Sequence, residues 1–294
     1  MARRKSFLER MLGGESQQAR DLREQEFRNV QAHAARQARR RAELEHAQVA
    51  PKPTPTCHQP VHDRIDPRLA ADLRDQNECL QFHLQRLTDV LHDREHGSAA
   101  TTQALVAAFR SGGAEQFAYA LQDQLSASPW PPSLPAQTTV PYYRSEARQL
   151  IIERELPRNS VIPPEQEYRL IANTIIPVPR RSEEVRHLYS QLIARIALRT
   201  VSEAFALTPP ALVESVVLNG RVNTVDRATG RAVNASLVSV QFGREAFEKL
   251  HLDAPNLDPE ACLHTYDARV SPSPYDLVPI QPLSDDLKHY RTIA

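Results

Sequence analysis

Three polar residues in the second half of the chain are of types that could surround a metal ion: Asp226, Gln241 and Glu245. Metal-dependent hydrolysis of a phosphodiester needs oxygen ligands around Mg²⁺ and a base or cation near the attacking water. These three residues are therefore the candidate catalytic residues of a nuclease-like site.

Each of the three also fits a role without a metal. Asp226 opens the turn Asp226–Gly230, where its side chain can bond the backbone. Gln241 and Phe242 point to opposite faces of a strand, so Gln241 faces away from the core if Phe242 enters it. Glu245 starts a helix, where a carboxylate suits the dipole. We therefore expect no catalytic site, no cofactor and no metal, and keep the nuclease as an alternative.

A second pattern, His92-Asp93-Arg94-Glu95-His96, matches the H-x-x-E-H arrangement of one class of zinc peptidases. His92, Glu95 and His96 would be the metal ligands, but a zinc site also needs a further ligand and a buried cleft. The pattern falls at the charged end of an expected helix, beside Gly97. A water-exposed helix end is the favoured interpretation.

The first 49 residues predict a charged helix, because good helix formers dominate and apolar residues are sparse. Arg36, Arg39, Arg40 and Arg41 are the candidate contacts to nucleic acid phosphates. The whole chain has 36 basic and 36 acidic residues, so no net charge attracts it to DNA or to a membrane surface. A solvated face is the favoured interpretation of this arginine cluster.

Residues 66–96 predict a helix that begins at Asp66 and Pro67. Apolar residues recur along it with heptad spacing. This seam consists of Leu73, Asn77, Leu80, Leu84, Leu87 and Leu91. The seam could hold two chains together, with Asn77 fixing the register, or it could pack on its own chain; the pattern leaves both open.

The fold class expected from the rest of the pattern is α+β. Residues 212–251 predict an antiparallel hairpin with Gly230 in its turn, followed by a helix, and Ser182–Phe205 predicts a long amphipathic helix beneath the hairpin. Ser182 is expected to cap that helix, and Arg186, Arg195 and Arg199 to face water. Single strands are expected at 147–156 and 167–176.

Proline-rich stretches divide the chain. The expected parts are a charged helical arm (1–49), a linker (50–65), a helical segment (66–127), a connector (128–141), an α+β domain (142–283) and a tail (284–294). No apolar run reaches the ~18 residues of a membrane span, and the N-terminus lacks the 7–15-residue apolar core of a secretory signal, so we expect none. Three distant cysteines fit a reducing compartment, so we expect a cytoplasmic protein.

Several sequence segments of the second half resemble those of a known family. They are LIIEREL at 150–156, IPPEQEY at 162–168, HLYSQLIARIALR at 187–199, ESVVLNGRVNTVDRATG at 214–230, DPEACL at 258–263 and SPSPYDLVPIQP at 271–282. Together they resemble a region of actinobacterial restriction endonucleases of the Mrr type. In those proteins a nuclease domain would follow Pro282, whereas this chain continues only to Ala294. The resemblance therefore implies an accessory region without its nuclease domain.

The Mrr-like nuclease fold places an acid on one strand and Glu/Gln-x-Lys on the next. Ser239–Gly243 occupies the place of that motif here, with Gly243 where the lysine would stand. We therefore expect a non-catalytic accessory or assembly protein of a DNA restriction or defence system. Its expected partner is a protein, either a second copy or a nuclease or helicase subunit. The alternatives are a degenerate Mrr-like nuclease and a structural coiled-coil protein.

Overall fold

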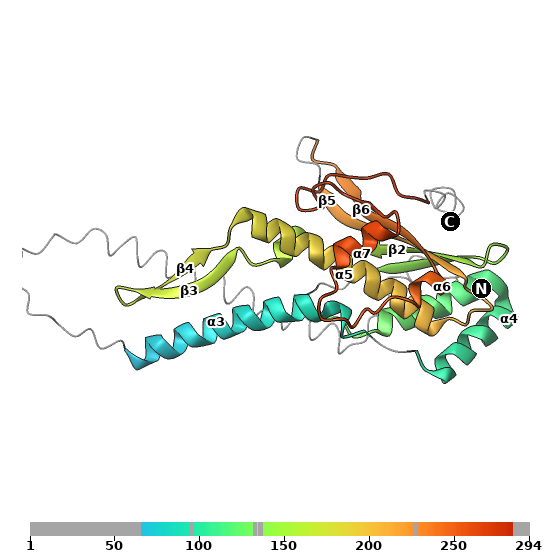
Figure 1. Ribbon diagram of the computed structural model, residues 1–294, viewed down its shortest axis with the longest axis horizontal. Helices are drawn as coiled ribbons and strands as arrows, with labels where there is room; N and C mark the ends of the chain where they lie inside the picture. Colours follow the sequence, from blue (N-terminus) through green and yellow to red (C-terminus); the bar gives the residue numbers. More distant parts are fainter. Residues whose placement is uncertain (1–65, 95–96, 132–133, 135–137, 226–228, 285–294) are drawn as a thin grey trace, which may run out of the picture. The chain divides into compact units, whose positions relative to one another are not determined.

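The computed structural model describes residues 66–94, 97–131, 134, 138–225 and 229–284 (Figure 1). The chain divides into two units, Met1–Asp63 and Arg64–Ala294, and every described residue belongs to the second. The expected charged arm, the linker and Arg36, Arg39, Arg40 and Arg41 lie outside the described residues.

The described unit mixes helices and strands, as the α+β expectation requires. Its helices are α3 (Pro67–Thr88), the 3₁₀ turn η1 (Asp89–Leu91), α4 (Ala99–Ala127), α5 (Ser182–Leu207), α6 (Arg244–Phe247) and α7 (Pro259–Thr265), with a further 3₁₀ turn at Asn159–Val161. Its strands are β1 (Thr139–Arg144), β2 (Gln149–Glu155), β3 (Glu165–Ile171), β4 (Thr174–Pro179), β5 (Ser215–Val225), β6 (Ala232–Gly243) and β7 (Arg269–Val270). No described helix is both long and apolar enough to span a bilayer.

The predicted hairpin is confirmed as β5 and β6, which pair antiparallel, and Gly230 has the expected positive φ of 67°. The hairpin forms the centre of a five-stranded sheet with the order β1-β2-β5-β6-β7. β2 runs parallel to β5, while the other neighbours are antiparallel. β1 and β7 were not predicted: β1 begins in a proline-rich stretch, and β7 is two residues long.

The long helix α5 packs against the β5–β6 hairpin as predicted, and its apolar side chains join those of the sheet in one core (Figure 1). Burial along α5 extends well beyond one stripe, because helices also cover the side away from the sheet. The expected cap is wrong: Arg181 is the N-cap residue, and Ser182 is already the first helical residue.

The single strand expected at 167–176 is wrong, because this segment folds back on itself as β3 and β4. The reversal occurs at Ala172 and Asn173, whose φ angles are 48° and 58°. Asn tolerates this left-handed conformation, so a two-residue turn needs no glycine here. Pro177 and Pro179 lie within β4, in a two-stranded sheet in which each strand is an edge, the position where a strand tolerates proline.

The expected connector at 128–141 contains the start of β1, which pairs with β2 and packs against α4. α4 is kinked at Gly113, which has a positive φ of 66°. α3 begins with Asp66 as its cap and Pro67 in its first turn, as predicted. Helices α3 and α4 thus belong to the same compact unit as the sheet.

Candidate functional site

The residues proposed for a nuclease site do not assemble into one among the described residues. Gln241 is exposed on its strand while Phe242 is buried, as predicted from their alternation. Glu245 is exposed and accepts a hydrogen bond from Lys249 at 2.8 Å, which holds the pKa of its carboxyl below the usual value. Asp226 lies outside the described residues. In the described ranges no group of three or more His, Cys, Asp or Glu could hold a metal ion.

The H-x-x-E-H pattern does not extend a helix, because α3 ends at Thr88 and η1 at Leu91. The expectation of one helix through His96 is therefore wrong; Glu95 and His96 themselves lie outside the described residues. Arg94, within the pattern, makes a two-pronged ion pair with Asp253 at 2.8 and 2.7 Å. His92 Nδ1 lies 3.7 Å from the same carboxylate. His92 and Arg94 thus attach the loop after α6, through Asp253, to the segment that follows η1.

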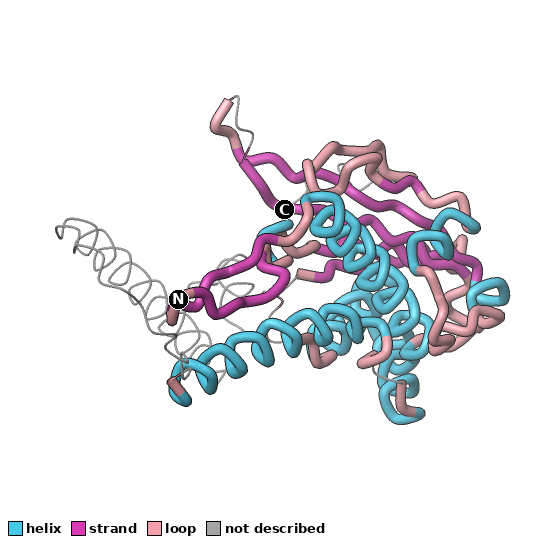
Figure 2. Tube along the Cα trace, turned by 60° about the vertical axis from the view of Figure 1, so that its left-hand side comes forward, coloured by secondary structure: helices cyan, strands magenta, loops and turns pink. Residues whose placement is uncertain are grey.

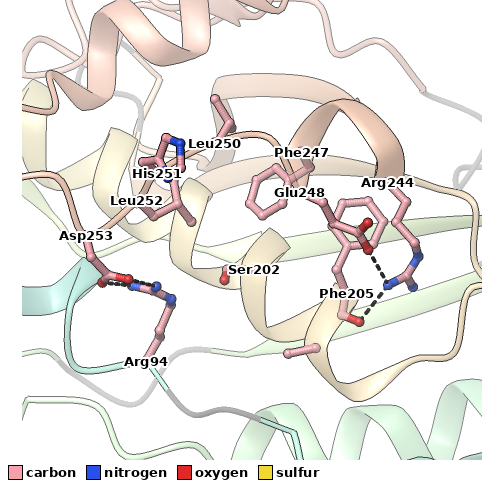
Figure 3. Close-up of a pocket in the computed structure, with 11 residues that line it drawn as sticks. Arg94, Ser202, Phe205, Arg244, Phe247, Glu248, Leu250, His251, Leu252 and Asp253 are labelled. Atoms are coloured by element: carbon pink, nitrogen blue, oxygen red, sulfur yellow. Dashed lines mark hydrogen bonds and ion pairs between the residues drawn. The ribbon is translucent and has the colours of Figure 1, made fainter.

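A cavity of about 340 Å³ lies between that loop, the end of α5 and α6 (Figure 3). Its lining residues are Arg94, Ser202, Phe205, Ala206, Arg244, Phe247, Glu248, Leu250, His251, Leu252 and Asp253. Figure 3 shows the Arg94–Asp253 pair at one end and Arg244 with Glu248 at the other, with Phe247 and Leu250 between them. The lining of the cavity therefore combines apolar side chains with two ion pairs.

The charged groups of this cavity already have structural partners. Arg244 donates hydrogen bonds to the main-chain oxygens of Val213, Phe205 and Thr208 at 2.9, 2.9 and 2.8 Å. Two of these carbonyls lie at the C-terminal end of α5, where helices leave acceptors without an intrahelical partner. Burial lowers the pKa of the Arg244 guanidinium. The arrangement holds α5 against β5 and β6, and it presents no activated nucleophile.

Among the residues that the structure describes, Arg199 on α5 is the most buried charged side chain, with an exposed fraction of 0%. The expectation that it faces water is therefore wrong. Its guanidinium donates to Glu203 at 2.7 Å, to Ser128 at 3.0 Å, and to the carbonyls of Val90 and Pro129 at 3.1 and 2.6 Å. Three separate segments of the described unit, α5, η1 and residues 128–129, thus meet at one charged group.

Trp130 lies between two arginines of this cluster. The guanidinium carbons of Arg199 and Arg154 each lie 4.1 Å from the centroid of its ring. Burial lowers the pKa of Arg154 to about 10. The i,i+4 spacing of Arg199 and Glu203 was a usable signal for the pair, but nothing local revealed that Ser128 and Trp130 would join it.

The heptad seam of α3 contacts its own chain. Leu80, Leu87 and Leu91 are buried. The Asn77 amide exchanges two hydrogen bonds with the main chain of Tyr168 on β3, at 3.0 and 2.8 Å. The Asn77 amide thus satisfies the main-chain N–H and C=O of Tyr168 as a neighbouring strand would. The contacts support the intrachain alternative, and self-association through the seam stays a prediction.

Helix α3 and the β3–β4 hairpin lie side by side in both views (Figures 1 and 2). Arg169 pairs with Ile176, and Ile171 with Thr174, so both isoleucines project from the same face of the hairpin. Their exposed fractions are 55% for Ile171 and 39% for Ile176.

Both edges of this hairpin are closed to a further strand. Asn77 occupies the outer edge of β3 at Tyr168. The main-chain N–H and C=O of Tyr168 bond Asn77 and therefore point away from β4. In an antiparallel pair the main-chain groups of the opposite residue, Pro177, then also point outward, as do those of residues 175 and 179. Two of them are proline, which has no N–H to donate. A partner of the hairpin must therefore contact its face.

No protein-family model matches the chain, and neither the curated proteins nor the solved structures include a match to it.

Proposed function

We propose that this chain is a non-catalytic accessory or assembly protein and that it binds a protein partner through the exposed face of the β3–β4 hairpin. The observation that carries the proposal is the pair Ile171 and Ile176, exposed on one face of a hairpin whose two edges are closed. Apolar side chains gathered on one exposed face are typical of protein-binding surfaces. The setting in a DNA restriction or defence system rests on the resemblance of the sequence.

The size of the face favours a partner with a groove over a second copy of the chain. β3 has seven residues and β4 has six. At about 3.4 Å per residue the face is roughly 20 Å long and 10 Å wide. Two such faces would bury roughly 400 Å², well below the ~1,000 Å² of a specific interface. A groove around the hairpin buries more, so the proposed partner is a different protein with such a groove. The resemblance of the sequence to restriction proteins is what makes a nuclease or helicase subunit the proposed partner.

The test is co-expression of the chain with a nuclease or helicase subunit encoded beside its gene. Ile171→Asp with Ile176→Asp should abolish co-purification of that subunit, because two charges would enter an apolar contact. The matched control is Val225→Asp with Val233→Asp, two valines with exposed fractions of 53% and 41% on the β5–β6 hairpin. The control should retain the subunit.

Equal retention by both variants would overturn the proposed surface. The nuclease alternative has its own readout, in which the purified chain is incubated with a plasmid and Mg²⁺ or Mn²⁺. We expect the plasmid to stay supercoiled. Nicking that disappears in the Asp226→Ala, Gln241→Ala double variant would overturn the non-catalytic proposal.

A further inference from the structure

A polar cavity of about 260 Å³ lies on the five-stranded sheet, on the face opposite the one packed on α5. Leu150 and Ile152 of β2 join the main core, so alternation places Glu153 and Glu155 on the opposite face. The residues that line the cavity are Thr138, Val140, Glu153, Arg154, Glu155, Arg221, Asn223 and Asn234. Val140 alone among these has an apolar side chain, so the cavity presents mainly polar groups.

A β-bulge brings Asn234 to this cavity. Gly220 of β5 pairs with Val238, but the next residue, Arg221, pairs with Ser236, so β6 has one extra residue at this point. As a result Asn234 lies opposite Asn223 and on the same face, whereas regular alternation would turn it toward the core. Bulges are frequent next to active sites, where they redirect a side chain in this way.

Buried polar side chains hold one carboxylate of the cavity in place. Ser239 Oγ donates to Asn219 Oδ1 at 2.6 Å, and Asn219 Nδ2 donates to Glu153 at 2.8 Å and to the carbonyl of Ser284 at 3.1 Å. The exposed fractions of Asn219 and Ser239 are both 0%. Arg221 forms an ion pair with Glu153 from the other side. The position of Glu153 is therefore fixed before any ligand binds.

The lining also retains groups that can bond a ligand. Glu155 accepts hydrogen bonds from Asn223 Nδ2 at 2.7 Å and from the Thr138 N–H at 3.4 Å, but a carboxylate has about four acceptor positions. The Asn234 amide is exposed and has both donors and an acceptor. The Arg221 guanidinium has five N–H donors, of which Glu153 engages those on Nε and Nη2.

These groups favour a neutral ligand with several hydroxyl groups. The charged lining residues are two glutamates and two arginines, so the lining has no formal net charge that would attract an ion. A hydroxyl both donates and accepts, so it can pair with a carboxylate oxygen as well as with an amide or guanidinium N–H. A volume of about 260 Å³ corresponds to roughly nine waters of ~30 Å³ each. That space suits a molecule of about ten to twelve non-hydrogen atoms.

We propose that this cavity binds a neutral polyhydroxylated molecule of the size of a monosaccharide. Glu155 accepts hydrogen bonds from its hydroxyl groups, and Asn234 and Arg221 donate to them. The site lies on a different surface from the hairpin face and does not depend on the proposed function.

The test follows binding of neutral probes to the full chain by saturation-transfer NMR, with D-glucose, D-mannose, D-galactose, D-ribose and myo-inositol. At least one probe should bind with a Kd of roughly 1–10 mM, the weak affinity expected for a small ligand in an open site. Asn234→Ala and Glu155→Ala should each weaken its binding by about fivefold, the effect of one lost hydrogen bond. The matched controls Asn256→Ala and Glu115→Ala remove an exposed amide and an exposed carboxylate elsewhere and should leave the Kd unchanged.

Thermal unfolding followed by circular dichroism checks that each variant stays folded. Glu155→Gln, which keeps the shape of the side chain, replaces Glu155→Ala if that variant unfolds. Absence of binding by every neutral probe at about 10 mM would overturn the proposal. A Kd that both cavity variants leave unchanged would also overturn it, because the probe would then bind elsewhere.

Charged sugars test the chemical class of the ligand. D-Glucosamine adds a positive charge to the glucose ring, and D-glucuronate adds a negative one. Both should bind no more tightly than the best neutral probe, because the lining has no net charge to attract them. Binding of either charged sugar that is tenfold tighter would make the cavity an ion site and would overturn the proposal.

Discussion

Arg199 shows how a single charged side chain can join distant segments. Its guanidinium reaches Glu203 on its own helix and the backbone at Val90 and Pro129. Arg199→Ala would leave the Glu203 carboxylate buried without its cation, so we expect a loss of about 3–5 kcal/mol in unfolding free energy. Urea unfolding followed by circular dichroism measures it.

The control for this prediction is Arg186→Ala on the same helix, whose ion pair with Asp276 is largely exposed. That change should lower the free energy of unfolding by less than about 1 kcal/mol. Arg199→Met with Glu203→Leu should recover about 1–3 kcal/mol relative to Arg199→Ala, because the buried Glu203 carboxylate is then removed together with its partner. Equal losses for Arg199→Ala and Arg186→Ala would contradict the assigned role.

Tyr189 predicts a pH dependence at the alkaline end. It is buried, its hydroxyl donates to the Pro157 carbonyl at 2.7 Å, and burial raises the pKa of the phenol. The folded state therefore keeps a proton that the unfolded state releases above pH ~10. This contribution to stability is present below that pH and falls by about 1.4 kcal/mol per pH unit above it.

Comparison with Tyr189→Phe isolates this effect. The variant lacks the hydrogen bond, so its free energy of unfolding near neutral pH should be about 1 kcal/mol lower than that of the unchanged protein. This difference in unfolding free energy should shrink and then reverse as pH rises beyond ~10. Arg154, whose pKa is lowered to about 10, acts with the opposite sign, but it is present in both proteins. A difference that stays constant up to pH 11 would contradict the prediction.

At the scale of elements, the Asn77 side chain joins α3 to the β3–β4 hairpin. Asn77→Leu removes both hydrogen bonds to Tyr168, so we expect the hairpin to separate more often from α3. Two such bonds contribute about 1–3 kcal/mol, and amide exchange at Tyr168 should quicken at least several-fold. Asn77→Asp keeps the acceptor for the Tyr168 N–H and should show a smaller effect.

The same variant separates the two interpretations of the seam. An asparagine between two chains limits the oligomers that a coiled coil can form, so Asn77→Leu would change the mass in solution. An unchanged mass with faster exchange at Tyr168 fits packing within the chain. A changed mass with unchanged exchange would favour self-association.

Periodicity explains which elements were predictable. The β5–β6 hairpin and α5 have long, regular apolar patterns, and Asp66 with Pro67 marks the start of α3. β3 and β4 were merged because Asn173 provides a turn without glycine, and β7 is too short to form a pattern. The Arg199 cluster was missed because Ser128 and Trp130, its partners, lie about 70 residues away in the sequence. The cavities depend on such distant contacts and left no local signal.

At the scale of the whole described unit, the helices and the sheet depend on each other. The proline-rich composition of 128–141 predicted a domain boundary, yet Ser128 and Pro129 bind Arg199 and β1 begins at Thr139. A fragment that begins at Tyr142 would lose these partners, half of β1 and the cover that α3 and α4 provide. We expect residues 142–294 to unfold or aggregate when expressed alone, and residues 64–294 to fold with a single cooperative thermal transition. Calorimetry of both fragments tests this, and a cooperative transition in the shorter one would restore the boundary at 128–141.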